Sequence, residues 1–498
     1  MKTFIPLLWA LLASIPAAAQ FTLTGKIEDY TGKEKVTVNI PVIYGFDHEN
    51  SLSVPVSATG EFSVVLPVDS MKFATLIFRR QFYTLLLTKD KQLHVRLQEQ
   101  DKTLELLTGN ALPENKLLRQ CGMDDVPFFL QHADAYDSVS FAGLHTKLIL
   151  PYQAAQAAKL AMVNASGVPQ PYRQLIASEV KYITFNYLND FARVRVNDRA
   201  VIDSFLLCVF DGISNEPEVF PAGPQYYTFV DNYIRFLETK AFIRIRQEKI
   251  PPHEQVPYFG ISLDSATVLV NKYGKDYWRW IGNNLNTPPA VTEVYTYQRL
   301  INLYNSKDLA PMQGLAGAFR KRFPASVYNA DISSKINTLV STLRRNGADT
   351  AIALVKDYNK VQSIYDVVNA LKGNVVYLDV WGTWCGPCKE ELKHVPQLRA
   401  EFGNKNVVFL YLDMDEEHRD DHWRQFILVN GLKGLHFRKN RQTIEPLWKE
   451  LLEEHYTGRQ SYPSYFIFDK AGRLVVRNAL RPSDGEALYK QINTILAQ

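Results

Sequence analysis

A pair of cysteines separated by two residues, Cys385 and Cys388, is the clearest chemical signal in this sequence. The apolar run before them, Val375–Trp381, predicts a buried β-strand, and apolar residues at helical spacing over 385–401 predict a helix. A cysteine in the first turn of a helix meets unpaired backbone N–H groups and the positive end of the helix dipole, which favour the thiolate. Such loops lower a cysteine pKa from about 8.5 to roughly 3.5–7.5. We therefore expect Cys385 to be an exposed nucleophile and Cys388, one turn later, to be a covered resolving thiol.

Two acidic residues are expected to complete this site. Asp379 lies in the apolar strand before the cysteines, where loss of hydration would raise its pKa and allow it to take the proton of Cys388. Glu391 lies one helical turn after Cys388 on the same face, so we expect it to share this proton relay.

A C-x-x-C pair is also half of a structural zinc site, which needs two further ligands. The remaining cysteines, Cys121 and Cys208, lie far away in a region with helical periodicity. Cys208 is flanked by apolar residues, which predicts a small buried side chain. We therefore expect no metal site, and no cofactor other than the redox-active disulfide between Cys385 and Cys388.

A second cluster of acids and histidines also suggests metal at first sight. Its members are Asp413, Asp415, Glu416, Glu417, His418 and His422. Arg419 follows His418 where a zinc-protease motif has glutamate, so that motif does not match. We interpret the cluster as a solvated helix start, where acids are favoured by the helix dipole.

The composition is that of a globular chain. Of 498 residues, 46% are hydrophobic and 22% are charged, which argues against wholesale disorder and multiple membrane spans. The formal net charge of +4 is far from the basic surface that binds a phosphate backbone, so we expect no nucleic-acid partner. Neither common phosphate-binding glycine spacing is present, and no G-x-S-x-G elbow indicates a serine hydrolase.

The rest of the chain divides into segments that must position the cysteines. Residues 1–19 have a positive start, an apolar stretch and a small-residue site, which predicts a cleaved signal peptide and an exported protein. Two-residue alternation over 20–109 predicts an antiparallel β-sandwich, and helical periodicity over 110–348 predicts an all-α domain. Residues 349–498 alternate buried strands with helices, which predicts an α/β domain with a mixed sheet.

The last segment carries a more detailed pattern. Its predicted strands are 375–380, 407–412, 465–468 and 474–477, and its predicted later helices lie near 416–430 and 443–456. A final helix is predicted to begin with a capping box at 483–486.

Residues 377–391 and 461–472 together resemble a known family. The first contains Trp-Cys-Gly-Pro-Cys-Lys-Glu-Glu and the second Ser-Tyr-Pro-Ser-Tyr-Phe-Ile-Phe-Asp, which are similar to the exported TlpA/ResA-like thiol-disulfide reductases of the thioredoxin fold. The resemblance implies that Pro463 is a cis-proline whose loop lies against the disulfide, and that Asp379 and Glu391 match the family's acids. Lys393 stands where the family usually has a helix-kinking proline. We expect substrate contacts from Trp384, Gly386, Pro387, Tyr462 and Pro463.

These features predict a periplasmic or cell-envelope thiol-disulfide oxidoreductase that reduces protein disulfides with Cys385 and Cys388. In an oxidising compartment its electrons must come from elsewhere, and we expect a membrane-embedded donor with its own dithiol. The resemblance implies cytochrome c maturation as one use of these electrons. A disulfide-forming oxidase or isomerase, and a non-enzymatic envelope protein that binds metal or a partner, remain as alternatives. The sequence does not predict the oligomeric state.

Overall fold

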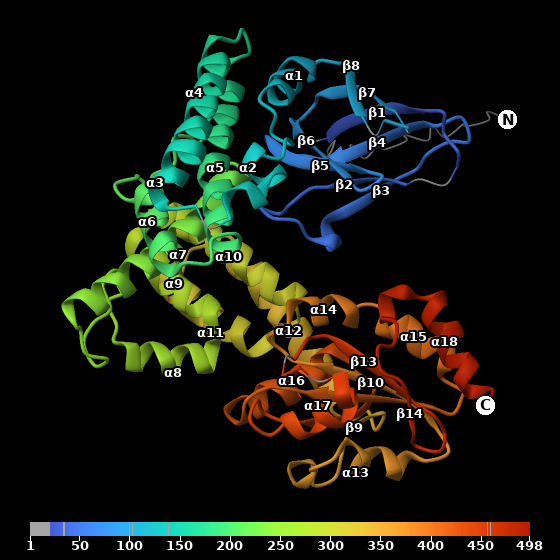
Figure 1. Ribbon diagram of the computed structural model, residues 1–498. Helices are drawn as coiled ribbons and strands as arrows, with labels where there is room; N and C mark the ends of the chain where they lie inside the picture. Colours follow the sequence, from blue (N-terminus) through green and yellow to red (C-terminus); the bar gives the residue numbers. More distant parts are fainter. Residues whose placement is uncertain are drawn as a thin grey trace, which may run out of the picture. The chain divides into compact units, whose positions relative to one another are not determined.

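The computed structural model describes residues 20–498 apart from 33, 34, 99, 102, 138, 456 and 459. The predicted signal peptide, residues 1–19, lies outside the described residues. Along the described chain, a β-rich region is followed by a helical region and then by a mixed α/β sheet (Figure 1). The multidomain layout predicted from the sequence is therefore confirmed.

The N-terminal region is a β-sandwich. Its strands are β1 Gln20–Glu28, β2 Val36–Asn39, β3 Ser51–Val54, β4 Glu61–Pro67, β5 Lys72–Phe78, β6 Gln81–Leu87, β7 Gln92–Gln98 and β8 Thr103–Thr108. They form two sheets, with the orders β4-β1-β7-β8 and β3-β2-β5-β6, and alternate side chains such as Phe21, Leu23 and Val95 fill the space between them. The pair β1–β7 is parallel, so the prediction of a purely antiparallel sandwich is wrong there. The chain runs through the second sheet between these strands, which gives the long connection that parallel pairing needs.

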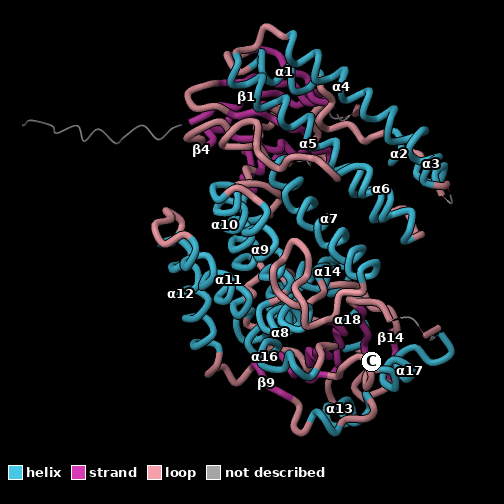
Figure 2. Tube along the Cα trace, turned by 90° about the vertical axis from the view of Figure 1, so that its left-hand side faces the viewer, coloured by secondary structure: helices cyan, strands magenta, loops and turns pink. Residues whose placement is uncertain are grey.

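The middle of the chain is helical, and Figure 2 draws its helices in cyan. The helices are α1 Leu112–Gln120, α2 Phe128–Gln131, α3 Phe141–Leu144, α4 Leu150–Ala165, α5 Gln170–Val194, α6 Arg199–Phe210, α7 Pro224–Glu248, α8 Leu263–Tyr273, α9 Lys275–Asn286, α10 Pro289–Asn305, α11 Leu309–Arg322 and α12 Asn329–Asn346. None of the helices in the described part of the chain is long and apolar enough to cross a membrane.

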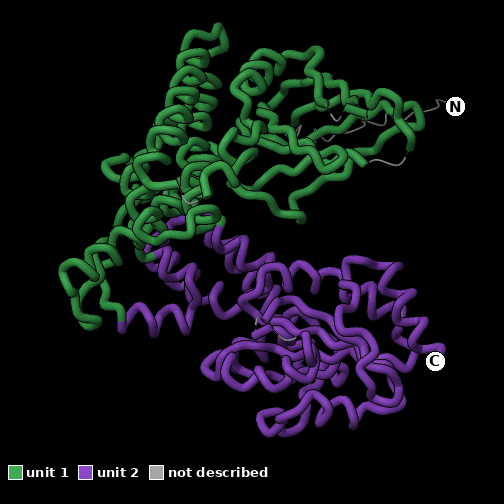
Figure 3. The backbone as a smooth tube through the Cα atoms, in the orientation of Figure 1, with its two compact units in different colours: residues 1–263, 281–298 green, residues 264–280, 299–498 purple. Residues whose placement is uncertain are grey.

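The chain groups into two compact units (Figure 3). The first comprises the described residues up to Leu263 with Ile281–Gln298, and the second comprises Asp264–Trp280 and Arg299–Gln498. Helices α11 and α12 therefore belong to the same unit as the C-terminal sheet. Within this unit α12 packs on helix α16 (Asp420–Asn430), and Asn346 donates a 2.7 Å hydrogen bond to a carbonyl of that helix. The domain boundaries predicted after residues 109 and 348 stay predictions.

The C-terminal sheet carries the cysteines. Its elements are β9 Ile352–Leu354, α13 Ile364–Val368, β10 Val375–Trp381, α14 Gly386–Leu392, α15 Val395–Phe402, β11 Val407–Asp413, α16 Asp420–Asn430, β12 Gly434–Arg438, α17 Glu445–Leu452, β13 Ser464–Phe468, β14 Leu474–Val476 and α18 Glu486–Leu496. The strand order is β14-β13-β10-β11-β12-β9. Strand β10 pairs in parallel with β11 and antiparallel with β13, so the predicted mixed sheet is confirmed.

Helices cover both faces of this sheet. Because successive side chains of a strand point to opposite faces, β10 directs Tyr377 and Trp381 to one face and Val376, Leu378 and Val380 to the other. The first face is covered by α14, α15, α16 and α18, and the second by α13 and α17. Figure 1 shows α15 and α18 on one side of the sheet and α13 on the other. Every residue of β10 is therefore buried.

Three local predictions differ from the structure. The helix predicted over 385–401 is two helices, because α14 ends at Leu392 and α15 starts at Val395 with a proline in its first turn. Strand β12 was not predicted, since its sequence contains glycine, histidine and arginine rather than an apolar run. The capping box at 483–486 is wrong, because Gly485 precedes α18 and Ser483 forms other hydrogen bonds.

Gly434, the first residue of β12, lies too close to β11 for a side chain. Its φ is +145°, and a Cβ there would lie 2.6 Å from the Phe409 carbonyl oxygen. We predict that Gly434→Ala destabilises the second unit by about 1–3 kcal/mol, because the backbone of a central strand must shift. The tryptophans of the described chain all lie in this unit, so their fluorescence during urea unfolding measures the effect; they are Trp278, Trp280, Trp381, Trp384, Trp423 and Trp448.

Gly403→Ala is the matched control. Gly403 has a helical φ of −58°, and the nearest atom to an added Cβ lies at 3.4 Å. We expect its unfolding midpoint to stay at the parental value. Equal midpoints for both variants would contradict the proposed clash at Gly434.

Candidate thiol-disulfide active site

The two cysteines form a disulfide at the start of α14. Cys385 is the N-cap residue, and its sulfur accepts a 3.2 Å hydrogen bond from the backbone N–H of Cys388. Pro387 lies in the first turn, where a missing N–H is tolerated. Cys385 is 4% exposed and Cys388 is 1% exposed, because both side chains join the apolar cluster beneath α14. The prediction that Cys385 is an exposed thiol is therefore wrong for the oxidised protein.

Aromatic side chains lie beside the disulfide. Trp384 is 49% exposed, and its ring contacts that of Tyr462 edge-on, with centroids 5.4 Å apart. The Tyr462–Pro463 peptide bond is cis, as the family resemblance implied. The structure therefore brings the loop of Pro463 next to the cysteine loop. Gly386 has open space around its Cα, so this part of the loop is accessible to another chain.

Asp379 lies on the same face of the sheet as the cysteine pair, because it alternates with Tyr377 and Trp381 along β10. Its cross-strand neighbours are Tyr411 and Tyr465. Burial, and to a smaller extent the negative charge of Glu391, raise the pKa of Asp379 well above its usual range. Its Oδ1 atom has no hydrogen-bond partner among the described residues. The structure thus agrees with the predicted shift and leaves one carboxyl oxygen available for proton transfer.

Glu391 is held by the segment before α18. Its two carboxylate oxygens accept 3.0 Å hydrogen bonds from the backbone N–H and the hydroxyl of Ser483. Arg481 lies 3.9 Å away at ion-pair distance. The sequence predicts Ser483 as a helix cap, and this contact with Glu391 could not be predicted from local pattern. The predicted share of Glu391 in proton transfer stays a prediction.

A buried pair of acids lies behind the cysteine loop, at the end of β11. Asp415 accepts a hydrogen bond from the hydroxyl of Thr383 in that loop, and Asp413 accepts a 2.8 Å bond from the backbone N–H of Asp415. Burial, and next the charge of Asp415, raise the pKa of Asp413 well above its usual range. The predicted solvated cluster is correct for the exposed residues 416–418. It is wrong for this pair, because β11 ends inside the sheet, and for His422, whose side chain is 15% exposed.

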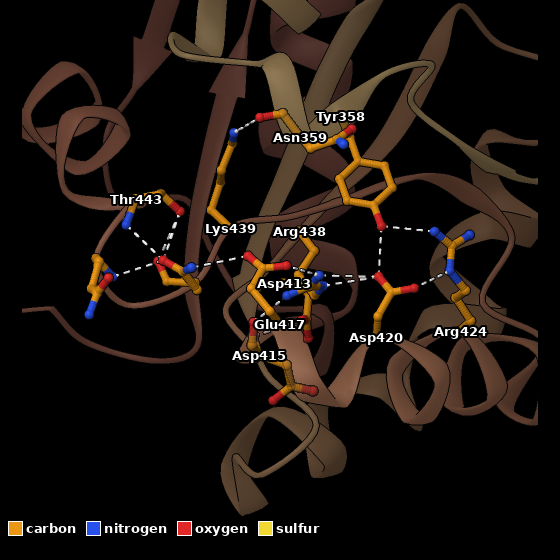
Figure 4. Close-up of polar contacts among 12 residues, drawn as sticks. Tyr358, Asn359, Asp413, Asp415, Glu417, Asp420, Arg424, Arg438, Lys439 and Thr443 are labelled. Carbon is orange, nitrogen blue, oxygen red and sulfur yellow. Dashed lines mark hydrogen bonds and ion pairs between the residues drawn. The ribbon is translucent and has the colours of Figure 1, made fainter.

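Arg438 at the end of β12 holds the segment that follows this acid pair (Figure 4). Its buried guanidinium donates 2.8 Å to the carbonyl of Asp415 and 2.7 Å to Glu417. Asp420 accepts from Arg438 at 3.2 Å and from the hydroxyl of Tyr358 at 2.6 Å. Figure 4 shows these bonds converging on Arg438 and Asp420. The sequence missed this network because it missed strand β12.

The other cysteines are separate from the site. Cys121 is buried in the first unit, and burial raises the pKa of its thiol to about 11. Cys208 is exposed, so its prediction as a buried side chain is wrong. Its helix α6 buries Phe205, Leu206 and Val209, which leaves position 208 on the outer face. Within the described residues, no group of three or more His, Cys, Asp or Glu side chains could hold a metal ion.

Comparison with known proteins finds thiol-disulfide oxidoreductases that are similar to part of this chain. The chain is 32% identical over 106 residues to the thiol-disulfide oxidoreductase ResA of Bacillus anthracis, covering 21% of this chain and 54% of that protein. It is 42% identical over 105 residues to ResA of Bacillus thuringiensis subsp. konkukian, with the same two coverages. The chain thus spans about half the length of these curated relatives. No family model matches the chain.

A solved structure gives a further comparison. The thioredoxin domain of a thiol-disulfide oxidoreductase from Bacteroides vulgatus is 21% identical, and the match covers 26% of this chain and 83% of that chain with a TM-score of 0.21. The matched part of this chain is similar to thiol-disulfide oxidoreductases named ResA, in agreement with the resemblance to the TlpA/ResA-like family predicted from residues 377–391 and 461–472.

The raised pKa of Asp379 makes a prediction about stability. Above about pH 4 the unfolded chain ionises this carboxyl while the folded protein keeps it protonated, so stability falls as pH rises toward the folded pKa. Each unit of pKa difference corresponds to about 1.4 kcal/mol. We predict that Asp379→Asn matches the parent at pH 4 and is more stable at pH 8, as measured by urea unfolding of the oxidised protein followed by tryptophan fluorescence.

The exposed residue Asp421 supplies the control. Asp421→Asn should follow the parental dependence of stability on pH. If Asp379→Asn also follows the parental curve between pH 4 and pH 8, the carboxyl of Asp379 is not held protonated by the fold.

Proposed function

We propose that this protein is an exported protein-disulfide reductase whose active centre is the Cys385–Cys388 pair. The observation that carries the proposal is a disulfide at the N-cap of α14, on the sheet face that also bears the buried carboxyl of Asp379. A helix start favours the thiolate that attacks, and a carboxyl with a raised pKa is suited to accept a proton near neutral pH.

The proposed reaction begins with the dithiol form. The Cys385 thiolate attacks one sulfur of a substrate disulfide, the substrate S–S bond breaks, and the second substrate sulfur leaves as a thiolate that takes a proton. Cys388 then loses its proton to the Asp379 carboxylate and attacks the Cys385 sulfur in the mixed disulfide. The substrate sulfur that Cys385 first attacked leaves as a thiolate and takes up a proton, and the protein becomes oxidised at Cys385 and Cys388. Two electrons have passed to the substrate.

Reduction is the proposed working direction. Strong disulfide oxidants stabilise their reduced thiolate so well that their own disulfide is easily reduced. Here the residues between the cysteines, Gly386 and Pro387, bring no side-chain donor or cation. Glu391 lies on the helix that carries Cys388, and its negative charge opposes a thiolate. These features support a disulfide that is relatively stable and a dithiol that gives up electrons readily.

The proposal also includes the setting of this reaction. We propose export by the signal peptide at residues 1–19 to the periplasm or cell envelope, and regeneration of the dithiol by a membrane-embedded protein with a reactive dithiol. Protein disulfides are the proposed substrates, bound at the loops of Trp384, Gly386, Pro387, Tyr462 and Pro463. Reduction of apocytochrome c cysteines is one such use, and it is suggested by the family resemblance.

Substitution of each cysteine tests the proposed roles. We predict that Cys385→Ser abolishes insulin reduction, because the attacking sulfur is lost. Cys388→Ala should retain the first attack and accumulate mixed disulfides, which are detected by mass spectrometry and released by dithiothreitol. Cys208→Ser, at an exposed cysteine outside the site, is the control and should keep parental activity. Mixed disulfides on Cys388 in a Cys385→Ser variant would reverse the assignment.

The reduction potential tests the direction. We predict a value on the reducing side of about −200 mV, closer to reductases than to the strong-oxidant value of about −120 mV. Equilibration with a glutathione series, followed by fluorescence of the exposed Trp384, measures it. A value near −120 mV would favour the oxidase alternative, and stoichiometric metal retained by the reduced, dialysed protein together with absent insulin reduction would favour a metal-binding role.

A further inference from the structure

A carboxylate from the helical segment contacts the active-site helix. Asp308 directly precedes α11 and belongs to the same compact unit as α14. Its Oδ2 atom accepts a 2.5 Å hydrogen bond from the ammonium of Lys389, and its Oδ1 atom lies 3.5 Å from Nε2 of His422. Asp308 is 8% exposed, so this contact is largely shielded from water. Charge pairs of this kind are stronger than those on an open surface.

Lys389 follows Cys388 and lies four residues after Cys385, and its backbone N–H donates a 3.1 Å bond to the carbonyl of Cys385. Residues four apart on a helix are neighbours, so the flexible Lys389 side chain is within reach of the Cys385 sulfur. In the structure its ammonium instead lies beside Asp308 and 5.2 Å from the centre of the Phe426 ring on α16. The cation is thus paired with a carboxylate.

Other polar groups complete the surroundings of Asp308. Arg419 donates a 3.0 Å hydrogen bond to Nδ1 of His422, so the proton of a neutral His422 ring lies on Nε2, facing Asp308. The same Nδ1 atom lies 3.3 Å from the hydroxyl of Thr383 in the cysteine loop, and that hydroxyl bonds to Asp415. Burial acts to raise the pKa of Asp308, but His422 and the charge of Lys389 outweigh it and hold this pKa below its usual range. Asp308 is therefore charged at neutral pH.

We propose that Asp308 is a positioning residue that pairs with the Lys389 ammonium, so that this cation does not stabilise the Cys385 thiolate, and thereby keeps the reduction potential of the disulfide low. The proposal rests on the proposed thiol chemistry. A thiolate exists only in the reduced form, so a nearby cation stabilises the dithiol state and makes the disulfide easier to reduce. Pairing with Asp308 removes this effect, and the helical segment in this way contributes a residue to the tuning of the active site.

A double-mutant cycle on the full-length protein tests this. Asp308→Asn keeps the shape of the side chain and a good helix N-cap but releases Lys389. In the equilibrium, two glutathione thiols reduce the Cys385–Cys388 disulfide and form one glutathione disulfide, with two electrons transferred. We expect Asp308→Asn to raise the equilibrium constant for protein reduction at least threefold, which is about 14 mV. We also expect Cys385 to be alkylated at least threefold faster at pH 6, since more thiolate is present.

The second arm uses Lys389→Gln. In the Lys389→Gln background, Asp308→Asn should change the equilibrium constant and the alkylation rate less than 1.5-fold, because no cation remains to be released. A full threefold change in that background would mean that Asp308 acts directly by its own charge, and it would overturn the proposal. The absence of any change on Asp308→Asn in the parental background would also overturn it.

Glu390→Gln is the matched control for charge. Glu390 is adjacent to Lys389 on α14, pairs with Lys393 at 3.1 Å, and has a side chain that is 61% exposed. Its neutralisation changes the net charge by the same amount as Asp308→Asn. We expect the equilibrium constant to stay within 1.5-fold of the parent. A threefold rise for Glu390→Gln would show that net charge, and not the Asp308–Lys389 pair, sets the potential.

A measurement on the parental protein covers the case in which Asp308→Asn does not fold. Acetylation of lysines, followed by mass spectrometry, should modify Lys389 at least fivefold more slowly than Lys393. The Lys389 side chain is 19% exposed and pairs with a buried carboxylate, whereas the Lys393 side chain is 39% exposed and its partner Glu390 is 61% exposed. Equal rates would overturn the pairing on which the proposal depends. None of these readouts needs a protein substrate, so they remain interpretable if the protein does not reduce insulin.

Discussion

The burial of strand β10 on both faces is the constraint around which the C-terminal sheet is organised. Its seven residues are all buried, and it pairs with β11 on one side and β13 on the other. Because β10 ends at Trp381, the cysteine loop begins at the carboxyl end of this central strand and leads directly into α14. The same burial removes water from Asp379, which is why a carboxyl in an otherwise apolar strand has a strongly raised pKa. One packing constraint therefore positions the disulfide and prepares the acid behind it.

Acidic groups dominate the surroundings of the disulfide. Asp379 and Glu391 lie on the side of the sheet that carries the cysteines, and Asp415 bonds to Thr383 within the loop itself. A helix start favours the thiolate of the cysteine, whereas the negative charge of Glu391 opposes it. The balance between these effects sets how readily the dithiol gives up electrons. An unpaired lysine next to Cys388 would shift this balance toward the thiolate. The pairing of Lys389 with Asp308 opposes that shift.

The helical segment bears on this balance because part of it belongs to the same compact unit as the sheet. Asp308 lies just before α11. The next helix, α12, packs on α16, and Asn346 donates a hydrogen bond to a carbonyl of α16. A thioredoxin-like domain that began at residue 349 would lack this carboxylate. Lys389 would then be free to approach the start of α14, where a positive charge favours the thiolate. The accessory helices can thus influence the chemistry without touching a substrate.

Features that depend on neighbouring residues could be predicted from the sequence. The cysteine spacing, the helix start after an apolar strand and the direction of the Asp379 pKa shift all follow from a few consecutive positions. The tertiary structure alone decided the burial of Cys385, the burial of Asp413 and Asp415, and the contacts of Glu391 with Ser483 and of Lys389 with Asp308. Local pattern cannot predict these, because exposure and charge pairing are set by whichever distant segment packs against a side chain, and those segments lie some 80 to 90 residues away.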